Sequence, residues 1–187
     1  MSIVMRNLKR IVTGFDPNGE SVITGDGMPP RCAAMTTIPG FWMSEIWAIN
    51  GAPTLPSTSD LTETMTHFVP DVGDIRVRIW SFPPATKARL TASPEALHAE
   101  LAALYPGFQN TQDPNDPGMH ITDTIDVNII ISGELILKLD SGEESRLGPG
   151  DSVVQLGTKH AWANDKSEPC IVATVMIGAG RLGDMSK

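Results

Sequence analysis

The chain has 187 residues, with 22 acidic and 14 basic side chains and a formal charge of -8 at pH 7. Such an acidic chain lacks the basic surface that binding to nucleic acid requires. No segment approaches the roughly 20 apolar residues of a membrane helix, and no lysine-rich amphipathic stretch suits a membrane surface. The length fits one domain with its own core, and the N-terminal residues lack the apolar run of a signal peptide, so we expect a cytoplasmic protein.

The N-terminal third is predicted to consist of strands and loops. Residues 8–25 are expected to form a hairpin, because Pro17 and Gly19 supply the backbone angles of a turn between two β-rich segments. Residues 25–39 are expected to be a loop, residues 41–50 a strand, and residues 51–66 a surface loop rich in Pro, Ser and Thr.

Residues 75–80 alternate apolar and basic side chains, which is typical of a half-buried strand. We expect the apolar face to be buried, with Arg76 and Arg78 on a solvated face; pairing with an anionic substrate is the alternative. The one helix is predicted over residues 94–104, with Ser93 as N-cap and Pro94 at the first helical position.

From residue 121 onward the sequence is almost entirely strand and turn. Strands are expected over residues 127–131 and 135–139, around residues 153–154, and over residues 171–177. Turns every 8–12 residues between such strands indicate an antiparallel sandwich or barrel.

Two segments about thirty residues apart each place a histidine at the edge of a predicted strand. The first runs from Gly118 through His120 to Asp126 and on to Gly133. The second begins at the Gly-Pro-Gly-Asp turn of residues 148–151 and continues through His160 to Asn164. Two strands that bring one imidazole each to a shared interior could hold a metal or polarise a small molecule.

These segments resemble the two signature motifs of the cupin superfamily over residues 117–178, about a third of the chain. In the second motif, the matching positions are Gln155, Gly157, His160 and Asn164. The resemblance implies an all-β fold, a cupin (jelly-roll) β-barrel of the RmlC-like kind, with an extended N-terminal strand and loop region and one short helix. It implies a single cupin domain over residues 1–187, in which residues 1–105 supply the N-terminal strands, loops and helix.

The first motif departs from the family pattern at two positions. Thr122 stands where cupins carry a second histidine, and Asp126 stands where they carry glutamate. The resemblance implies a divalent transition metal, Fe, Mn, Zn, Ni or Cu, and the matching positions offer His120, Asp126 and His160 as its ligands. The same three residues are the candidate catalytic groups. Alternatively, the histidines are hydrogen-bonded barrel residues, and Asp126 is a general base or a satisfied buried carboxylate.

Residues of equal parity share one face of a strand, which extends the candidate site to neighbouring side chains. The predicted substrate-binding residues are the polar or aromatic side chains expected inside the barrel, namely Thr122, Thr124, Asn128, Gln155 and Trp162.

The sequence therefore predicts a small-molecule cupin enzyme that acts on an oxygenated organic compound. The reaction would be of the lyase, isomerase, decarboxylase or dioxygenase type, with a metal as the favoured cofactor. The alternative is a cupin that binds a small molecule without metal and without chemistry. A homodimer is expected, because the resemblance implies pairing through N-terminal strands and an unpaired edge strand favours it.

Overall fold

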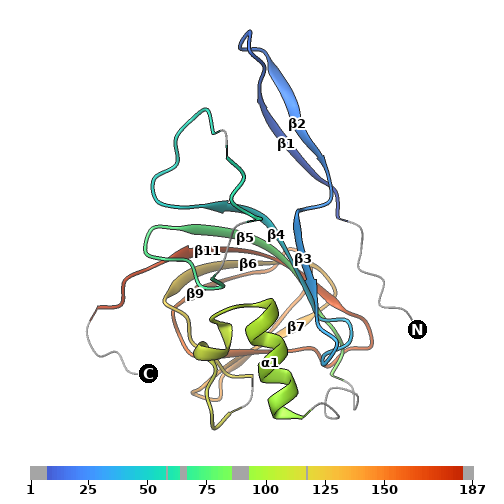
Figure 1. Ribbon diagram of the computed structural model, residues 1–187. Helices are drawn as coiled ribbons and strands as arrows, with labels where there is room; N and C mark the ends of the chain where they lie inside the picture. Colours follow the sequence, from blue (N-terminus) through green and yellow to red (C-terminus); the bar gives the residue numbers. More distant parts are fainter. Residues whose placement is uncertain (1–7, 58, 64–66, 86–92, 117, 183–187) are drawn as a thin grey trace.

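The computed structural model describes residues 8–57, 59–63, 67–85, 93–116 and 118–182 (Figure 1). Its main element is a six-stranded antiparallel sheet. In spatial order the strands are β3 (Arg31–Ala34), β4 (Trp42–Ile49), β5 (Ile75–Phe82), β11 (Cys170–Gly178), β6 (Thr124–Ser132) and β9 (Ser152–Leu156).

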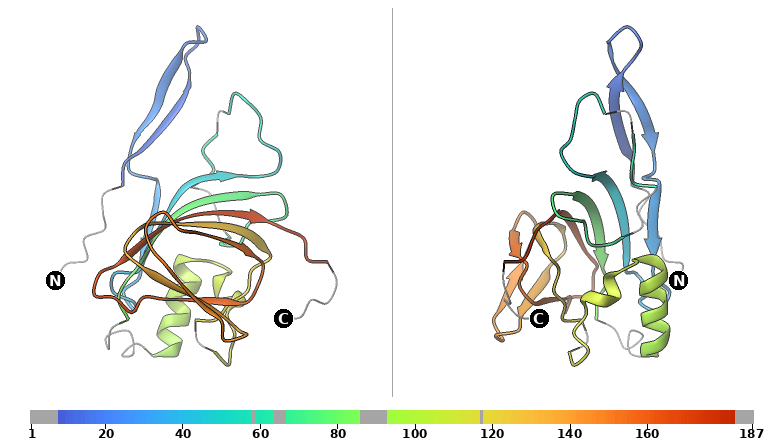
Figure 2. Two further views of the ribbon diagram at one scale, coloured as in Figure 1. Left: turned by 180° about the vertical axis from the view of Figure 1, so that it is seen from behind. Right: turned by 60° about the vertical axis from the view of Figure 1, so that its left-hand side comes forward.

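A second, three-stranded sheet closes the barrel, with the order β10 (His160–Ala163), β7 (Leu135–Leu139) and β8 (Glu144–Leu147). Figure 2 shows the two sheets curving around a common interior. A backbone bridge between His120 and His160 ties the segment that precedes β6 to β10. The predicted all-β barrel is therefore confirmed, and sequentially distant strands build its walls.

The elements before β6 match most of the predictions. The hairpin of β1 (Arg10–Phe15) and β2 (Ser21–Gly27) stands clear of the barrel in every view (Figures 1 and 2). The predicted loop over residues 25–39 is wrong in part, because β3 forms there by pairing with β4. A short 3-10 helix, η2 (Phe108–Thr111), leads into the first motif.

The predicted helix is α1 (Pro94–Leu104), and the side chain of Ser93 accepts a hydrogen bond from the Ala96 N–H as expected of an N-cap. Glu100 fastens the helix to the loop before β4: its two carboxylate oxygens accept hydrogen bonds from the backbone N–H and hydroxyl groups of Thr36 and Thr37. Three helix leucines, at positions 97, 101 and 104, pack against the hydrophobic core.

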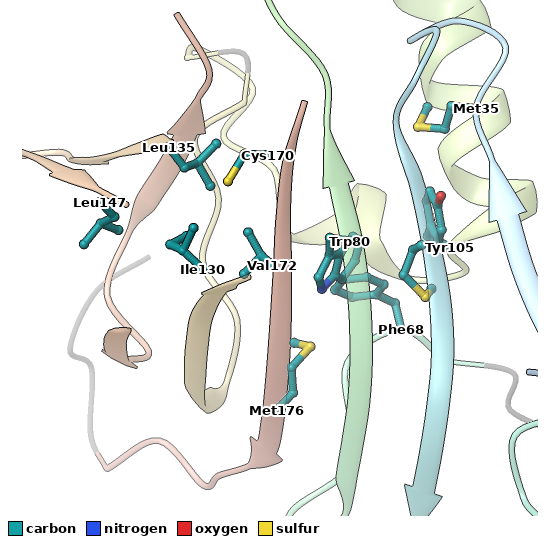
Figure 3. Close-up of a cluster of buried hydrophobic side chains, with 11 residues drawn as sticks. Met35, Phe68, Trp80, Tyr105, Ile130, Leu135, Leu147, Cys170, Val172 and Met176 are labelled. Atoms are coloured by element: carbon teal, nitrogen blue, oxygen red, sulfur yellow. The ribbon is translucent and has the colours of Figure 1, made fainter. Parts of the chain in front are cut away.

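That core fills one end of the barrel, whereas the other end is polar. Ile130, Val172 and Trp80 lie side by side across β6, β11 and β5, and they belong to the buried cluster in Figure 3. The next rows along the same inner face contain Asn128 and Asp126, whose neighbours on β11 are Thr174 and Met176. The inner face thus changes from apolar to polar within two residues, and this change places the site.

The prediction for β5 has its two faces reversed. Arg78 is fully buried and points inward, where its Nε donates a hydrogen bond to the Glu45 carboxylate over 2.8 Å. Arg76 is also buried and contacts Asp74. The expected solvated arginine face is therefore the interior, because β4 and the chain before β5 supply carboxylates that the alternating pattern cannot reveal.

The opposite side of the sheet is apolar. We define the outer face as the residues that point away from the barrel on four neighbouring strands. They are Ile75, Val77 and Ile79 of β5, Ile171, Ala173, Val175 and Ile177 of β11, Ile125, Val127, Ile129 and Ile131 of β6, and Val154 and Leu156 of β9. Within the described part of the chain, no helix is both long and apolar enough to span a membrane.

Candidate functional site

The two motif histidines meet at the barrel wall. The backbone N–H of each residue donates to the carbonyl of the other, and both distances are 2.9 Å. This bridge holds the imidazole rings 4.3 Å apart between centroids. Phe108 contacts the edge of the His120 ring, and Trp162 contacts the edge of the His160 ring. The two motif histidines therefore come together as expected, but His120 lies in an isolated bridge before β6 and only His160 lies in a strand, β10.

Hydrogen bonding sets the state of both imidazoles. Nδ1 of His120 lies 3.1 Å from the Gly118 carbonyl, and Nδ1 of His160 lies 2.9 Å from the Thr158 carbonyl. Because a carbonyl only accepts, each Nδ1 carries the proton, and each Nε2 presents a lone pair. Burial lowers the pKa of His160, while burial together with the nearby His160 lowers the pKa of His120 to about 4. Both rings are therefore neutral at pH 7.

Asp126 lies within the polar part of the inner face, between Gln155 on β9 and Met176 on β11. Its side chain is buried, and its Oδ1 has no hydrogen-bond partner. Burial raises the pKa of Asp126 to about 6, although Thr124 and the positive charge of Arg78 oppose the shift. A buried carboxylate with an unused acceptor atom is strained electrostatically, which is common at functional sites.

Four of the five predicted substrate-binding residues are buried around Asp126 and bonded within the wall. The hydroxyls of Thr122 and Thr124 share a 2.7 Å hydrogen bond, and Thr174 donates to the Asn128 side chain over 2.8 Å. The Gln155 amide donates to the Thr158 carbonyl and hydroxyl. The Thr158 carbonyl also lies within hydrogen-bond distance of His160. Gln155, which pairs with Asp126 in the sheet, is therefore connected through Thr158 to the histidine pair.

Trp162 is half-buried and lies between the His160 ring, at 5.8 Å, and Phe82, at 6.3 Å between centroids. It packs against the hydrophobic core as well. Trp162 thus forms the border between the core and the histidine pair.

The donor set fits the implied metal only in part. Two Nε2 lone pairs, each on a ring fixed by an Nδ1–H···O=C bond, are the arrangement of metal-binding imidazoles. However, no group of three His, Cys, Asp or Glu side chains in the described residues could hold a metal ion together. Asp126 is therefore not placed as a third ligand beside the histidines, and the three-ligand metal site stays a prediction.

Sequence reasoning missed a buried ion pair that lies beside this site in the same six-stranded sheet. Arg78 and Glu45 are both fully buried, and Arg78 also contacts the Met176 sulfur and the Phe68 carbonyl and ring. Arg78 lies directly beside Thr174 in the sheet, in the same row as Asn128. The alternation of apolar and basic residues in β5 separates two faces of the strand, but it does not show which of the two faces points into the barrel.

The turn after β6 passes close to the start of β11, and the motif residue Gly133 lies at this close approach. Gly133 has a left-handed φ of 78°, and a Cβ there would lie 2.6 Å from the Pro169 carbonyl oxygen and 2.9 Å from the Cys170 Cα. Only glycine fits this crossing of the β6–β7 turn over the start of β11.

No family model matches the chain. A protein of the phomopsin biosynthesis cluster of Diaporthe leptostromiformis, protein C', is 50% identical over 46 residues, 25% of this chain and 24% of that protein. Oryzines biosynthesis cluster protein J of Aspergillus oryzae is 43% identical over 49 residues, 26% of this chain and 27% of that protein. A cupin-domain-containing oxidoreductase of Aspergillus ruber is 41% identical over 66 residues, 35% of this chain and 29% of that protein.

The chain thus spans less than a third of the length of these curated relatives. Among solved structures, a chain from the crystal structures of two DMSP lyases has a TM-score of 0.41 and 17% identity, over 79% of this chain and 53% of that one. A Cupin 2 conserved barrel domain protein from Salinispora arenicola has a TM-score of 0.38 and 13% identity, over 74% and 76%. The barrel and the paired motif histidines agree with the resemblance to the cupin superfamily, and the relative described as a cupin-domain-containing oxidoreductase matches a 66-residue segment of this chain.

Proposed function

We propose that this chain is a small-molecule cupin enzyme that transfers protons on an oxygenated organic compound, with Asp126 as the general base. The observation that carries the proposal is the Asp126 carboxylate, buried in the barrel with an Oδ1 that accepts no hydrogen bond. A pKa of about 6 leaves Asp126 mostly ionised at pH 7 and close enough to neutrality to take and return a proton.

The neighbouring residues suit the binding of oxygen-containing groups. The Nε2 atoms of His120 and His160 can accept hydrogen bonds from substrate hydroxyls, because both rings are neutral and hold their protons on Nδ1. Asn128 and the paired threonine hydroxyls at 122 and 124 can rearrange to donate or accept. Such a set supports isomerisation, dehydration or decarboxylation beside a carbonyl, where one carboxylate moves a proton.

The named relatives favour a biosynthetic substrate. Two are described as biosynthesis cluster proteins and one as an oxidoreductase. We extend to this chain the class of substrate, an oxygenated intermediate of a biosynthetic route, because the matched segments are similar.

The proposal is tested by solvent-deuterium exchange. The protein is incubated in D2O with a panel of α-hydroxy ketones and β-keto acids, and deuterium uptake is followed by mass spectrometry. Uptake that the wild type accelerates and Asp126→Asn does not would support the proposal. Asp140→Asn, in an exposed turn, is the matched control. Equal rates for the wild type and Asp126→Asn on a turned-over compound would reject Asp126 as base.

Metal dependence is tested on the same protein by elemental analysis. About one equivalent of Fe, Mn, Zn, Ni or Cu, lost in both His120→Ala and Asp126→Ala, would establish the three-ligand site and replace the acid–base mechanism with a metal-dependent one, including the dioxygenase type. Full exchange activity in protein stripped by a chelator would support the acid–base mechanism.

One observation favours the alternative of a binding protein without chemistry. Most polar side chains of the inner face bond to each other, as Thr122 does to Thr124 and Asn128 to Thr174. A compound that raises the melting temperature strongly, yet is recovered unchanged and unlabelled from D2O, would support that alternative.

A further inference from the structure

A surface pocket lies beyond the polar end of the barrel, where β6 begins, β11 ends and the chain approaches β5. Its volume is about 420 Å³, which is in the range of pockets that take small organic molecules. The lining comes from segments far apart in the sequence, namely residues 67 and 69–72, residues 106–107 after α1, residue 123, and residues 179–181. The lining residues therefore differ from those of the candidate site described above.

A close backbone crossing lies between this pocket and the Asp126 row. Gly178 is the last residue of β11 and precedes the pocket residues 179–181. A Cβ at Gly178 would clash with the Asp71 carbonyl oxygen, so the chain before β5 passes directly over the end of β11. The Gly73 N–H fastens the crossing by donating to the Gly178 carbonyl over 2.9 Å. The pocket is therefore a second cavity, separate from the inner face around Asp126.

Arg181 holds an oriented guanidinium at this pocket. Its Nη2 donates to the carbonyl oxygens of Thr122 and Gly157 over 3.3 and 3.1 Å, and its Nε donates to the Asp123 carboxylate over 2.6 Å. Within the part of the chain that the structure describes, these bonds leave Nη1 without an acceptor. A guanidinium that backbone carbonyls hold in place, with N–H groups still unused, suits the carboxylate of a ligand.

The charges of the lining indicate that the ligand also carries a positive group. Besides Arg181, the pocket is lined by Asp71 and Asp123, and His67 adds an imidazole. The Asp123 side chain is 62% exposed, so it remains accessible beside Arg181. Two carboxylates beside one guanidinium would repel a ligand that is only anionic, but they would attract an ammonium group. A ligand with one carboxylate and one ammonium group complements all three charges.

The rest of the lining is apolar. The apolar residues with large side chains are Val69, Pro70, Val72 and Pro106. Val72 is 73% exposed, so an apolar group in the pocket would remove part of its surface from water. The body of the ligand is therefore expected to be apolar.

We propose that this pocket binds an α-amino acid with an apolar side chain. The N–H groups of Arg181 Nη1 donate to its carboxylate, while Asp71 and Asp123 accept hydrogen bonds from its ammonium group. The proposal goes beyond the proposed function, because this binding uses neither Asp126 nor the histidine pair.

The test is a titration of the full chain, followed by ligand-observed NMR, with three probes of nearly the same shape. Leucine carries both charges, isocaproate lacks the ammonium group, and isopentylamine lacks the carboxylate. We expect leucine to bind about tenfold more tightly than either analogue, because each analogue loses one charge-assisted contact. Absence of saturable leucine binding would overturn the proposal, as would isocaproate that binds as tightly as leucine.

Variants of the charged lining separate the two halves of the site. Arg181→Met should weaken leucine about tenfold without weakening isopentylamine. Asp71→Asn and Asp123→Asn should each weaken leucine roughly threefold, yet strengthen isocaproate, because they remove a charge that repels its carboxylate. Asp140→Asn, in an exposed turn, is the matched control and should change neither. Leucine affinity that none of the three variants changes would overturn the proposal.

The opposite response of the two probes also guards against a loss of folding, which would weaken both. Circular dichroism shows in addition that each variant is folded. Asp126→Asn should bind leucine as tightly as the wild type, and loss of leucine binding in that variant would place the ligand inside the barrel and overturn the proposal. Deuterium exchange takes no part in this measurement, so this proposal and the proposed function can fail separately.

Discussion

Replacing Asp126 by asparagine should stabilise the protein while it abolishes the proposed proton transfer. The side chain is buried, and its pKa rises from the ordinary 3.8 to about 6 because the charged form is poorly solvated. At about 1.4 kcal/mol per unit, the ionised carboxylate costs about 3 kcal/mol of folding free energy above pH 6. Asparagine has nearly the same shape and no charge, so the cost disappears.

The sign depends on pH, which makes the prediction specific. The folded state holds the Asp126 proton more tightly than the unfolded state, so the penalty is absent below pH 3.8, grows between pH 3.8 and about 6, and is complete above. His120 acts in the opposite direction: its lowered pKa means that stability is lost as pH falls from 6.5 to about 4. In the wild type the two effects partly cancel in this window.

The assay is thermal and urea unfolding of the wild type and Asp126→Asn at pH 8, 6 and 4.5. We expect a gain of about 3 kcal/mol at pH 8, or roughly 6–12 °C in Tm for a chain of this length, shrinking to about 1 kcal/mol at pH 4.5. Asp126→Asn should also lose stability on acidification more steeply than the wild type. A variant that is less stable at pH 8, or a gain independent of pH, would refute the reasoning, and Asp140→Asn should change little at any pH.

Three further outcomes follow from contacts described above. Glu45→Gln should cost about 3–5 kcal/mol in urea unfolding, because it leaves the buried Arg78 guanidinium without its carboxylate. Glu100→Gln should cost about 2 kcal/mol near neutral pH. Although burial opposes it, hydrogen bonds from two threonines lower the pKa of Glu100 to about 2, so this loss should fade as pH falls from 4.5 to about 2; a constant loss would contradict the assignment. His160→Ala should leave the far-ultraviolet circular dichroism spectrum unchanged but remove the acid-induced charging of a buried imidazole, seen as one fewer low-pKa histidine in an NMR titration.

Local chemistry made most elements predictable. Ser93 and Pro94 define the helix start, because the Ser93 side chain accepts a hydrogen bond from a first-turn N–H and proline has its φ fixed near the helical value. The turn at Asp16 to Gly19 defines the first hairpin. By contrast, Arg31 to Ala34 shows no alternation and follows a Pro-rich stretch. It is a strand only because β4 lies beside it, and such long-range pairing leaves no trace in a four-residue segment.

The candidate site was likewise predictable from the sequence only in part. The meeting of His120 and His160 followed from the motif spacing, and the inward direction of Asp126 and Asn128 followed from strand parity. The reversed faces of β5 did not follow, because alternation separates two faces without stating which is inside. The deciding partner of Arg78 is Glu45, 33 positions earlier, and only the folded sheet brings the two together.

The crossing at Gly133 bears on how such sequences are recognised. The glycine at that place is required by the clearance between two backbones, 2.6 Å from a would-be Cβ to the Pro169 oxygen. A barrel could therefore lose every imidazole and carboxylate and still preserve the glycine framework of the signature. Searches that weight those glycines as heavily as the histidines would collect inert barrels alongside working ones.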